Sequence, residues 1–273
     1  MKFCRLVKYD LKNGILPKIY KYLITFVMGF IIIFAFRMII KDANPTITNM
    51  LFYLFQGKEP FEKDISDAFV FPIVWLIIYI LGAYITLEYP FDNMTGHGLS
   101  VIVRIKNRSY WWASKCIYTT CSTLLYFVMW YMGALIASVV SGAELSFTYS
   151  DIVNMDYISI EIIKDLSHIE VVILTIILPV LTGIAFNMIM LCLQLYIDRL
   201  YCFWIVTFYI FAATYFKTPF LIGNFAMLKR SAFCIEDGYS LTTGICVELL
   251  VIVVCITVGL IRIRKYDILN KEN

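Results

Sequence analysis

The residues that could do chemistry are few, and five of them stand inside long apolar stretches. They are Arg37, Glu170 and Glu248, which ionise, and the amides Asn187 and Gln194. Polar groups at membrane depth are costly, and they mark either a substrate path or a hydrogen bond between helices. The three ionisable residues would share a depth near the outer membrane surface, so Arg37 is expected to pair with one of the two glutamates. A structural tie and a substrate site both remain open for these positions.

Motifs of known catalytic chemistry are missing from the sequence. It contains no H-E-x-x-H, no paired aspartates for Mg²⁺ and no G-x-x-x-x-G-K-[ST] for a nucleotide. His97 and His168 are isolated, and the eight cysteines show no C-x-x-C or metal-ligand spacing. Most cysteines lie in apolar runs, where cysteine behaves as a small hydrophobic residue. We therefore expect no catalytic residue, no metal and no cofactor in this chain.

The composition indicates that lipid is the solvent for most of the protein. Of 273 residues, 61% are hydrophobic and 16% are charged, and the mean hydropathy is +0.79. A soluble domain of this length carries about 45–50% apolar and about 25% charged residues. The net charge of +3 is too small to indicate nucleic acid as a partner. The expected class is an all-α integral membrane protein made of one domain, 1–273.

Six apolar runs are long enough to cross a bilayer as helices, and the five polar residues lie within them. A hydrocarbon core of about 30 Å needs about 20 mostly apolar residues in a helix. The predicted spans are 22–40, 69–88, 115–140, 169–196, 200–216 and 244–262. The first of them follows a basic segment but no A-x-A-like cleavage site, so we expect a retained helix rather than a secretory signal.

The distribution of lysine and arginine predicts the orientation of the spans. Fifteen basic residues fall on one side of the predicted membrane and seven on the other. Cytoplasmic loops carry the excess of Lys and Arg. We therefore expect a multi-pass protein of a bacterial cytoplasmic membrane, with both termini in the cytoplasm.

Two cytoplasmic segments carry further information. In 1–21, the apolar side chains of Phe3, Leu6, Val7 and Leu11 share one helix face, and a basic face opposes them. This pattern is typical of an amphipathic helix in the membrane interface, which serves as a topology anchor or as a contact for a cytoplasmic partner. The residues of the basic face are Arg5, Lys8 and Lys12.

The second segment is the predicted cytoplasmic loop 89–114. Its glycines permit a turn, and a helix beginning at Leu99 would place Arg104 and Arg108 on one side. Tyr110, Trp111 and Trp112 then mark the start of the third span, as an aromatic belt does. The loop is either a set of topology-defining charges or a helix that docks another protein.

The layout of the whole chain resembles the ABC-2-type permeases, the membrane subunits of bacterial ABC exporters. The resemblance rests on the basic amphipathic N-terminus, the six spans and a loop of the form Gly98-x5-Arg104-x3-Arg108-x2-Trp111-Trp112-x2-Lys115. It also rests on two later groups of residues, which are Gly223, Asn224, Ala226, Met227, Lys229 and Arg230, and then Arg264-Lys265-Tyr266-Asp267-Ile268-Leu269.

This resemblance implies partners and sites. The loop would be a coupling helix that sits on a separate ATP-binding-cassette ATPase through Gly98, Arg104, Lys106 and Arg108. ATP and Mg²⁺ would bind that partner, and a second permease subunit, identical or related, would complete the exporter. Residues 217–243 would form an outer re-entrant segment before the last span. The cargo would be an antimicrobial peptide, a lipophilic compound or a drug.

Two other classes of function remain as alternatives. A secondary carrier also places polar residues near the membrane midplane and uses discontinuous helices. A membrane scaffold or immunity protein would work without an ATPase. An intramembrane hydrolase or transferase would need the catalytic motifs that this sequence lacks.

Overall fold

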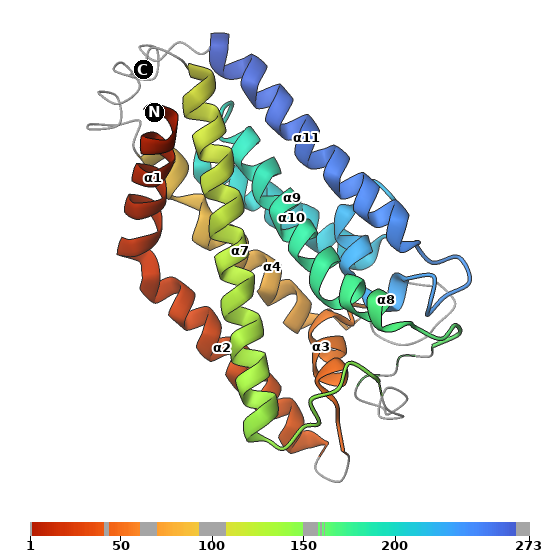
Figure 1. The fold of residues 1–273 in the computed structure, drawn as a ribbon. Coiled ribbons are helices and arrows are strands. Elements are labelled where there is room, and N and C mark those ends of the chain that lie inside the picture. Colours follow the sequence, from red (N-terminus) through yellow and green to blue (C-terminus); the bar gives the residue numbers. More distant parts are fainter. Residues whose placement is uncertain are drawn as a thin grey trace.

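The computed structural model describes residues 2–40, 44–60, 70–92, 108–149, 158, 160 and 162–265, and it is all-helical in these parts. The helices run roughly side by side in one bundle (Figure 1). Their bounds are α1 Lys2–Ile15, α2 Ile19–Ile39, α3 Ile47–Phe55, α4 Ile73–Leu87, α5 Tyr89–Asp92, α7 Arg108–Val140, α8 His168–Val172, α9 Leu178–Leu193, α10 Arg199–Tyr215 and α11 Leu241–Lys265.

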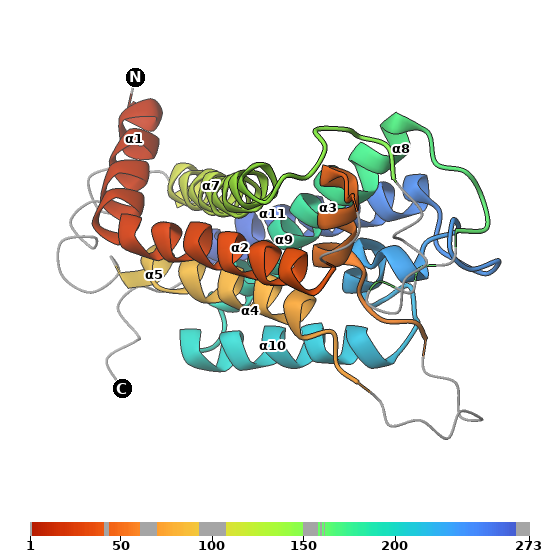
Figure 2. The same cartoon turned by 90° about the horizontal axis from the view of Figure 1, so that it is seen from below.

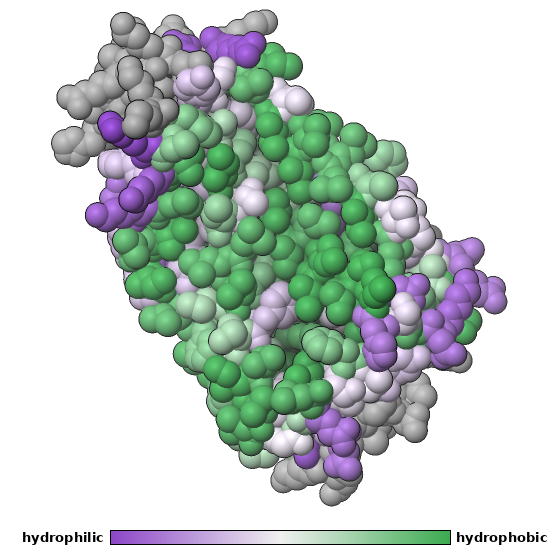
Figure 3. All heavy atoms as spheres, viewed as in Figure 1, coloured by the Kyte–Doolittle hydropathy of each residue, from purple (hydrophilic) through white to green (hydrophobic). Residues whose placement is uncertain are grey.

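Five of the helical stretches are long and apolar enough to cross a membrane. They are Phe3–Ile39, Ile73–Phe91, Arg108–Val140, His168–Leu193 and Leu241–Arg264, whereas the apolar α10 has 17 residues. Hydrophobic side chains cover the middle of the face in Figure 3, and hydrophilic residues gather at its two ends. An apolar belt between polar ends is what a bilayer requires of a multi-pass protein. The described part of the chain is thus a multi-pass membrane protein by its helices and its surface.

Several helices begin at other residues than the predicted membrane spans. The third span was expected at 115–140, but α7 begins at Arg108, so the end of the predicted loop 89–114 is helical. Trp111 and Trp112 are buried, and Trp112 Nε1 donates a 2.9 Å bond to the Ile256 carbonyl of α11. The helix of the second predicted span, α4, begins only at Ile73, because Pro72 precedes it and cannot donate a helical hydrogen bond.

Residues 41–68 lie between the first two predicted spans, and they include a buried helix. All but one of the nine residues of α3 are buried, among them Phe52 and Phe55. The Thr46 side chain caps the helix by accepting from the Asn49 amide. With only nine residues, α3 is too short to stand out as a membrane span, and tertiary packing stabilises it.

A proline in the fourth span changes the helix before it. Pro179 in α9 has no N–H for the Thr175 carbonyl, which lies four residues earlier. The backbone there widens into a π-helical turn, Ile173–Ile177, and the Tyr131 hydroxyl of α7 donates a 2.9 Å bond to the Thr175 carbonyl. A neighbouring helix therefore satisfies the carbonyl that the proline leaves free, as expected for a membrane helix.

Glycines allow α2 and α7 to approach each other closely. A Cβ atom at Gly29 would lie 2.8 Å from the Trp130 carbonyl oxygen. A Cβ at Gly133 would overlap the Phe26 carbonyl oxygen and lie 2.9 Å from the Phe30 amide nitrogen. Small residues permit such backbone contact between membrane helices, where packing replaces the hydrophobic effect as the source of stability.

The change Gly133→Ala is expected to lower the melting temperature of the purified protein in detergent. The added methyl meets backbone atoms of α2, which cannot rotate away, and overpacking of this kind costs about 1–3 kcal/mol. Gly82→Ala is the matched control, since its Cβ would meet only the ring edge of Tyr126, at 3.1 Å. Equal melting temperatures for the two variants would contradict the close α2–α7 contact.

Candidate functional site

A buried ion pair joins the N-terminal helix to the third long helix at the basic end of the bundle. Asp10 of α1 lies 2.9 Å from the Lys115 ammonium of α7, and both residues are 1% exposed. Ser114 Oγ donates a 2.5 Å bond to the other carboxylate oxygen, and the Tyr89 hydroxyl donates to the first at 3.1 Å. The Lys115 ammonium also lies over the Tyr89 ring, 4.6 Å from its centre. The charges are therefore paired and hydrogen-bonded, as burial requires.

The sequence pattern of α1 explains why Asp10 points inward. Leu6 is buried, and Asp10 follows it by four residues, so both lie on the same helix face. The basic side chains Arg5, Lys8 and Lys12 are exposed on the other face, as the amphipathic pattern predicts. Sequence reasoning missed Asp10 and Lys115 as a pair. An acidic residue on the apolar face of α1 was the signal that could have revealed it.

A second group of charges connects the start of the first span with the end of the second. Lys18 and Lys21 lie 2.8 Å and 3.0 Å from the same carboxylate oxygen of Glu88. Lys21 also stands over the ring of Tyr84 in α4, at 4.5 Å from its centre. Two cations therefore share one partly exposed carboxylate at this end of the bundle.

The residues that the resemblance assigns to ATPase coupling are only partly visible. Gly98, Arg104 and Lys106 lie outside the described residues. Arg108 is the exposed first residue of α7, and its Nη1 donates to the Arg264 carbonyl at 3.5 Å. Residues 93–107 lie outside the described parts, but the helices on either side of them both contact Asp10 of α1. Tyr89 of α5 and Ser114 of α7 each donate a hydrogen bond to the Asp10 carboxylate. The two ends of the predicted loop and α1 thus belong to one packed unit.

The two amides of the fourth span tie helices together inside the bundle. Asn187 of α9 donates to Thr123 Oγ1 of α7 at 2.8 Å, and its side-chain oxygen accepts from Thr86 of α4 at 3.0 Å. Gln194 donates a 3.1 Å bond to the Leu87 carbonyl at the end of α4. Bonds of this kind contribute about 0.6–2 kcal/mol each in membranes. Both side chains act as structural ties.

The expected pairing of Arg37 with a glutamate is not made. Arg37 donates to the carbonyls of Ser141, at 3.2 Å, and Ile40, at 2.9 Å, near the ends of α7 and α2. Glu170 caps α8, where its carboxylate accepts from the Ser167 amide at 2.8 Å. Glu248 lies in α11, is fully buried and accepts from the Thr182 hydroxyl of α9. The side chains of Arg37, Glu170 and Glu248 thus bond to different partners.

The segment between α10 and α11 is packed into the bundle by a buried arginine. Arg230 is 0% exposed, and its guanidinium donates to the carbonyls of Ala213 at 2.5 Å, Thr214 at 2.6 Å and Lys58 at 2.8 Å. It also bonds the Asn224 side-chain oxygen. Burial lowers the pKa of Arg230 to about 10, so the group remains a cation at neutral pH.

The acceptors of Arg230 explain its position. The carbonyls of Ala213 and Thr214 belong to the last turn of α10, where no helical N–H is left to bond them. A cation at a helix C-terminus is also favoured by the helix dipole. Trp75 of α4 adds a 3.3 Å bond to the Ala226 carbonyl of the same segment. No pattern in the sequence distinguishes Arg230 from the neighbouring Lys229.

Comparisons with protein-family models, with curated proteins and with solved structures find no match to this chain.

Proposed function

We propose that the chain is the membrane-spanning subunit of an ATP-driven exporter. Six helices would cross the bilayer, with α10 as the short fifth span, and α1 would lie in the cytoplasmic interface. The segment 217–243 would re-enter the outer leaflet, and the loop 89–114 would dock a separate ATP-binding-cassette ATPase. A second permease subunit would complete the translocation path.

The observation that carries the proposal is the attachment of α1 to α7 and α5. The buried Asp10–Lys115 pair fixes α1 to the start of α7. The hydrogen bond from Tyr89 to Asp10 fixes α1 to α5, where the predicted loop begins. A force applied by a partner to this unit would reach the long helix α7 directly. Coupling between ATP hydrolysis and transport needs an element whose conformational equilibrium is shifted by both the nucleotide site and the transport path. The unit of α1, α5 and the start of α7 is suited to that role.

A secondary carrier remains the second candidate because of Glu248. Its Oε1 accepts from Thr182, whereas Oε2 is buried and has no hydrogen-bond partner among the described residues. Ionisable groups at membrane depth often lie on ion or proton paths. Transport driven by an imposed pH gradient in vesicles without any ATPase would favour this candidate over the exporter.

The docking prediction is tested by reversing two charges. In Arg104→Glu with Arg108→Glu, membrane insertion is expected to persist, because other basic residues still define the inner face. Copurification with a coexpressed ATP-binding-cassette ATPase should fall about tenfold or more, or hydrolysis should no longer drive export. The measurement combines pull-down, ATPase activity and export in reconstituted vesicles.

The matched control for this experiment keeps the charges. Arg104→Lys with Arg108→Lys is expected to retain insertion and most of the copurification, since the positive charge remains at both positions. Normal, coupled export from the double glutamate variant would refute the docking assignment. In that case the basic residues of the loop would serve the topology alone.

A further inference from the structure

One acidic residue lies within the apolar run of the last helix. From Leu241 to Ile261 of α11, Glu248 is the single residue of the charged types. Helix α11 lies beside α9 and α7 (Figure 2), and the Glu248 side chain is turned into the bundle, where it is 0% exposed. Ionisable residues are costly inside a membrane, and those that face the bundle interior commonly take part in function.

The register of α9 against α11 places the Glu248 carboxyl between the two helices. Gly244 precedes Glu248 by four residues on the same helix face, and a Cβ atom there would lie 3.1 Å from Leu178 Cδ2 of α9. Leu178 in turn precedes Thr182 by four residues, and the Thr182 hydroxyl donates to Glu248 Oε1. The small Gly244 therefore lets the helices approach closely beside a carboxyl and a hydroxyl that are both fully buried.

A carboxylate at this position would lack compensation. Within the part of the chain that the structure describes, Thr182 is the hydrogen-bond partner of Glu248 Oε1, and Oε2 is buried without any partner. An unpaired ion in a low dielectric costs several kcal/mol, and such a group is usually neutralised instead. A proton on Oε2 would remove the charge and leave Oε1 free to accept from Thr182.

The titratable groups that face Glu248 from the neighbouring helices are phenols. Tyr79 of α4 interacts electrostatically with Glu248, and Tyr131 of α7 interacts in turn with Tyr79. The single thiol of α9, Cys192, lies ten residues after Thr182, and the segment Ile222–Ala226 beside α11 has no ionisable residue. Among the described residues, no basic side chain interacts with the carboxyl.

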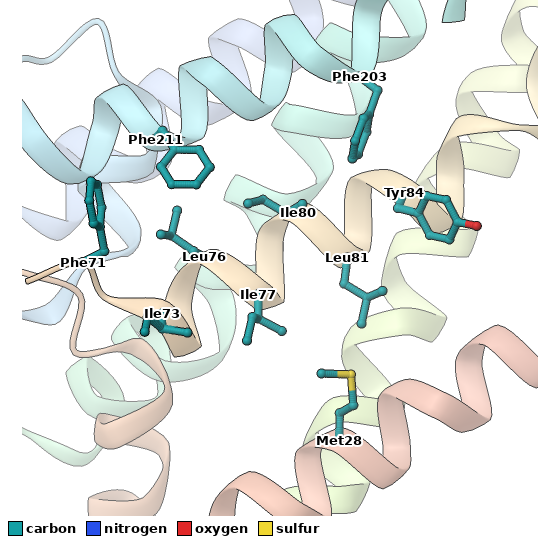
Figure 4. Close-up of a pocket in the computed structure, with 10 residues that line it drawn as sticks. All are labelled: Met28, Phe71, Ile73, Leu76, Ile77, Ile80, Leu81, Tyr84, Phe203 and Phe211. Carbon is teal, nitrogen blue, oxygen red and sulfur yellow. The ribbon is translucent and has the colours of Figure 1, made fainter. Parts of the chain in front are cut away.

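Helix α4 separates this neighbourhood from the apolar outer surface. Its outer face lines an apolar groove, to which Ile73 and Ile77 belong (Figure 4). Tyr79 lies on the opposite face, is buried, and donates a 3.2 Å bond from its hydroxyl to the Pro179 carbonyl of α9. The groove is therefore not the surroundings of Glu248, whose carboxyl lies inside the bundle.

We propose that Glu248 is a proton-binding site within the membrane. The proton is held on Oε2 while α9 and α11 are packed together, and Oε1 accepts from the Thr182 hydroxyl. Release of the proton leaves a buried carboxylate with a single donor, so ionisation favours a state in which water enters between the two helices. The inference does not rest on the exporter proposal, since it needs neither an ATPase nor a cargo.

The composition of the site favours a proton over a metal ion as the ligand. Hard divalent cations such as Ca²⁺ take about six or more oxygen ligands, often from several carboxylates. The described residues contain no group of three His, Cys, Asp or Glu side chains that could hold a metal ion. One carboxyl with one hydroxyl is sufficient for a proton.

The test is infrared difference spectroscopy on the intact chain in lipid vesicles at neutral pH. An un-ionised carboxyl has a carbonyl stretch that is separate from the bands of amides and carboxylates. The wild type is expected to show such a band, and Glu248→Gln should abolish it, because the amide cannot carry the proton. The amide oxygen can still accept from Thr182, so the packing of α9 against α11 should be retained.

Three further variants make the assignment of the band specific. Glu170→Gln is the matched control and should leave the band unchanged, because the Glu170 carboxylate caps α8 by accepting from the Ser167 amide. Thr182→Val removes the donor to Oε1 and should shift the band without abolishing it. Glu248→Asp keeps a carboxyl and should also shift the band, so the assignment does not depend on the folding of the glutamine variant.

Two results would overturn the proposal. Identical spectra of the wild type and both Glu248 variants in the region of un-ionised carboxyls would show that Glu248 is a carboxylate at neutral pH. Loss of the wild-type band on addition of Na⁺ at constant pH would show that the site takes a metal ion. Neither spectrum involves ATP, so the proton site and the exporter proposal can fail separately.

Discussion

Asp10→Ala is expected to destabilise the protein more than any other single change to α1. The substitution leaves the Lys115 ammonium buried without its carboxylate, and breaking a buried pair in this way costs about 3–5 kcal/mol. Ser114 and Tyr89 lose their acceptor as well. The melting temperature in detergent should fall by on the order of 10 °C. Because α1 is held to α7 by this pair, α1 should also become accessible to protease.

Removal of both charges separates pairing from simple packing. Asp10→Leu with Lys115→Met is expected to recover much of the loss, since an apolar pair of similar volume often replaces a buried ion pair without penalty. Asp198→Ala is the matched control, because Asp198 is exposed and its side chain makes no cap bond at the start of α10. Equal losses for Asp10→Ala and Asp198→Ala would contradict a structural role of the pair.

Arg230→Ala is expected to release the segment that precedes the last span. The change leaves the last carbonyls of α10 and the Asn224 side chain without their donor. Each buried polar group left unpaired costs about 1–3 kcal/mol, so the total should reach about 3 kcal/mol or more. Lys229→Ala is the matched control, because Lys229 pairs at 3.1 Å with the exposed Glu59, and exposed pairs contribute about 0–1 kcal/mol.

Cys234 provides a local measurement of this release. Burial raises the pKa of the Cys234 thiol, so little reactive thiolate is present at neutral pH in the folded protein. If Arg230→Ala loosens the segment, the pKa should return toward its ordinary value and maleimide should react faster. The experiment uses a variant in which Cys234 is the only cysteine. Unchanged reactivity together with an unchanged melting temperature would refute the role given to Arg230.

Hydropathy along the sequence was sufficient to predict that the protein is a helical membrane protein. A span is a local property, because each helix satisfies its own backbone hydrogen bonds within one apolar run. The same reasoning predicted the amphipathic α1, since helical periodicity is read from neighbouring residues. It failed for α3, whose nine residues are too few to make a distinctive run.

Only the tertiary structure decided which polar groups meet. Asp10 and Lys115 are 105 residues apart, and Arg230 reaches the end of α10 and the segment before α4. The expected partners Arg37 and Glu248 turn toward different neighbours. Depth follows from the number of residues between a side chain and the membrane surface. Contact depends on how each helix is rotated about its axis and on which helices lie next to it. The packing of helix faces determines both, as where Gly29 of α2 and Gly133 of α7 allow the two backbones to approach.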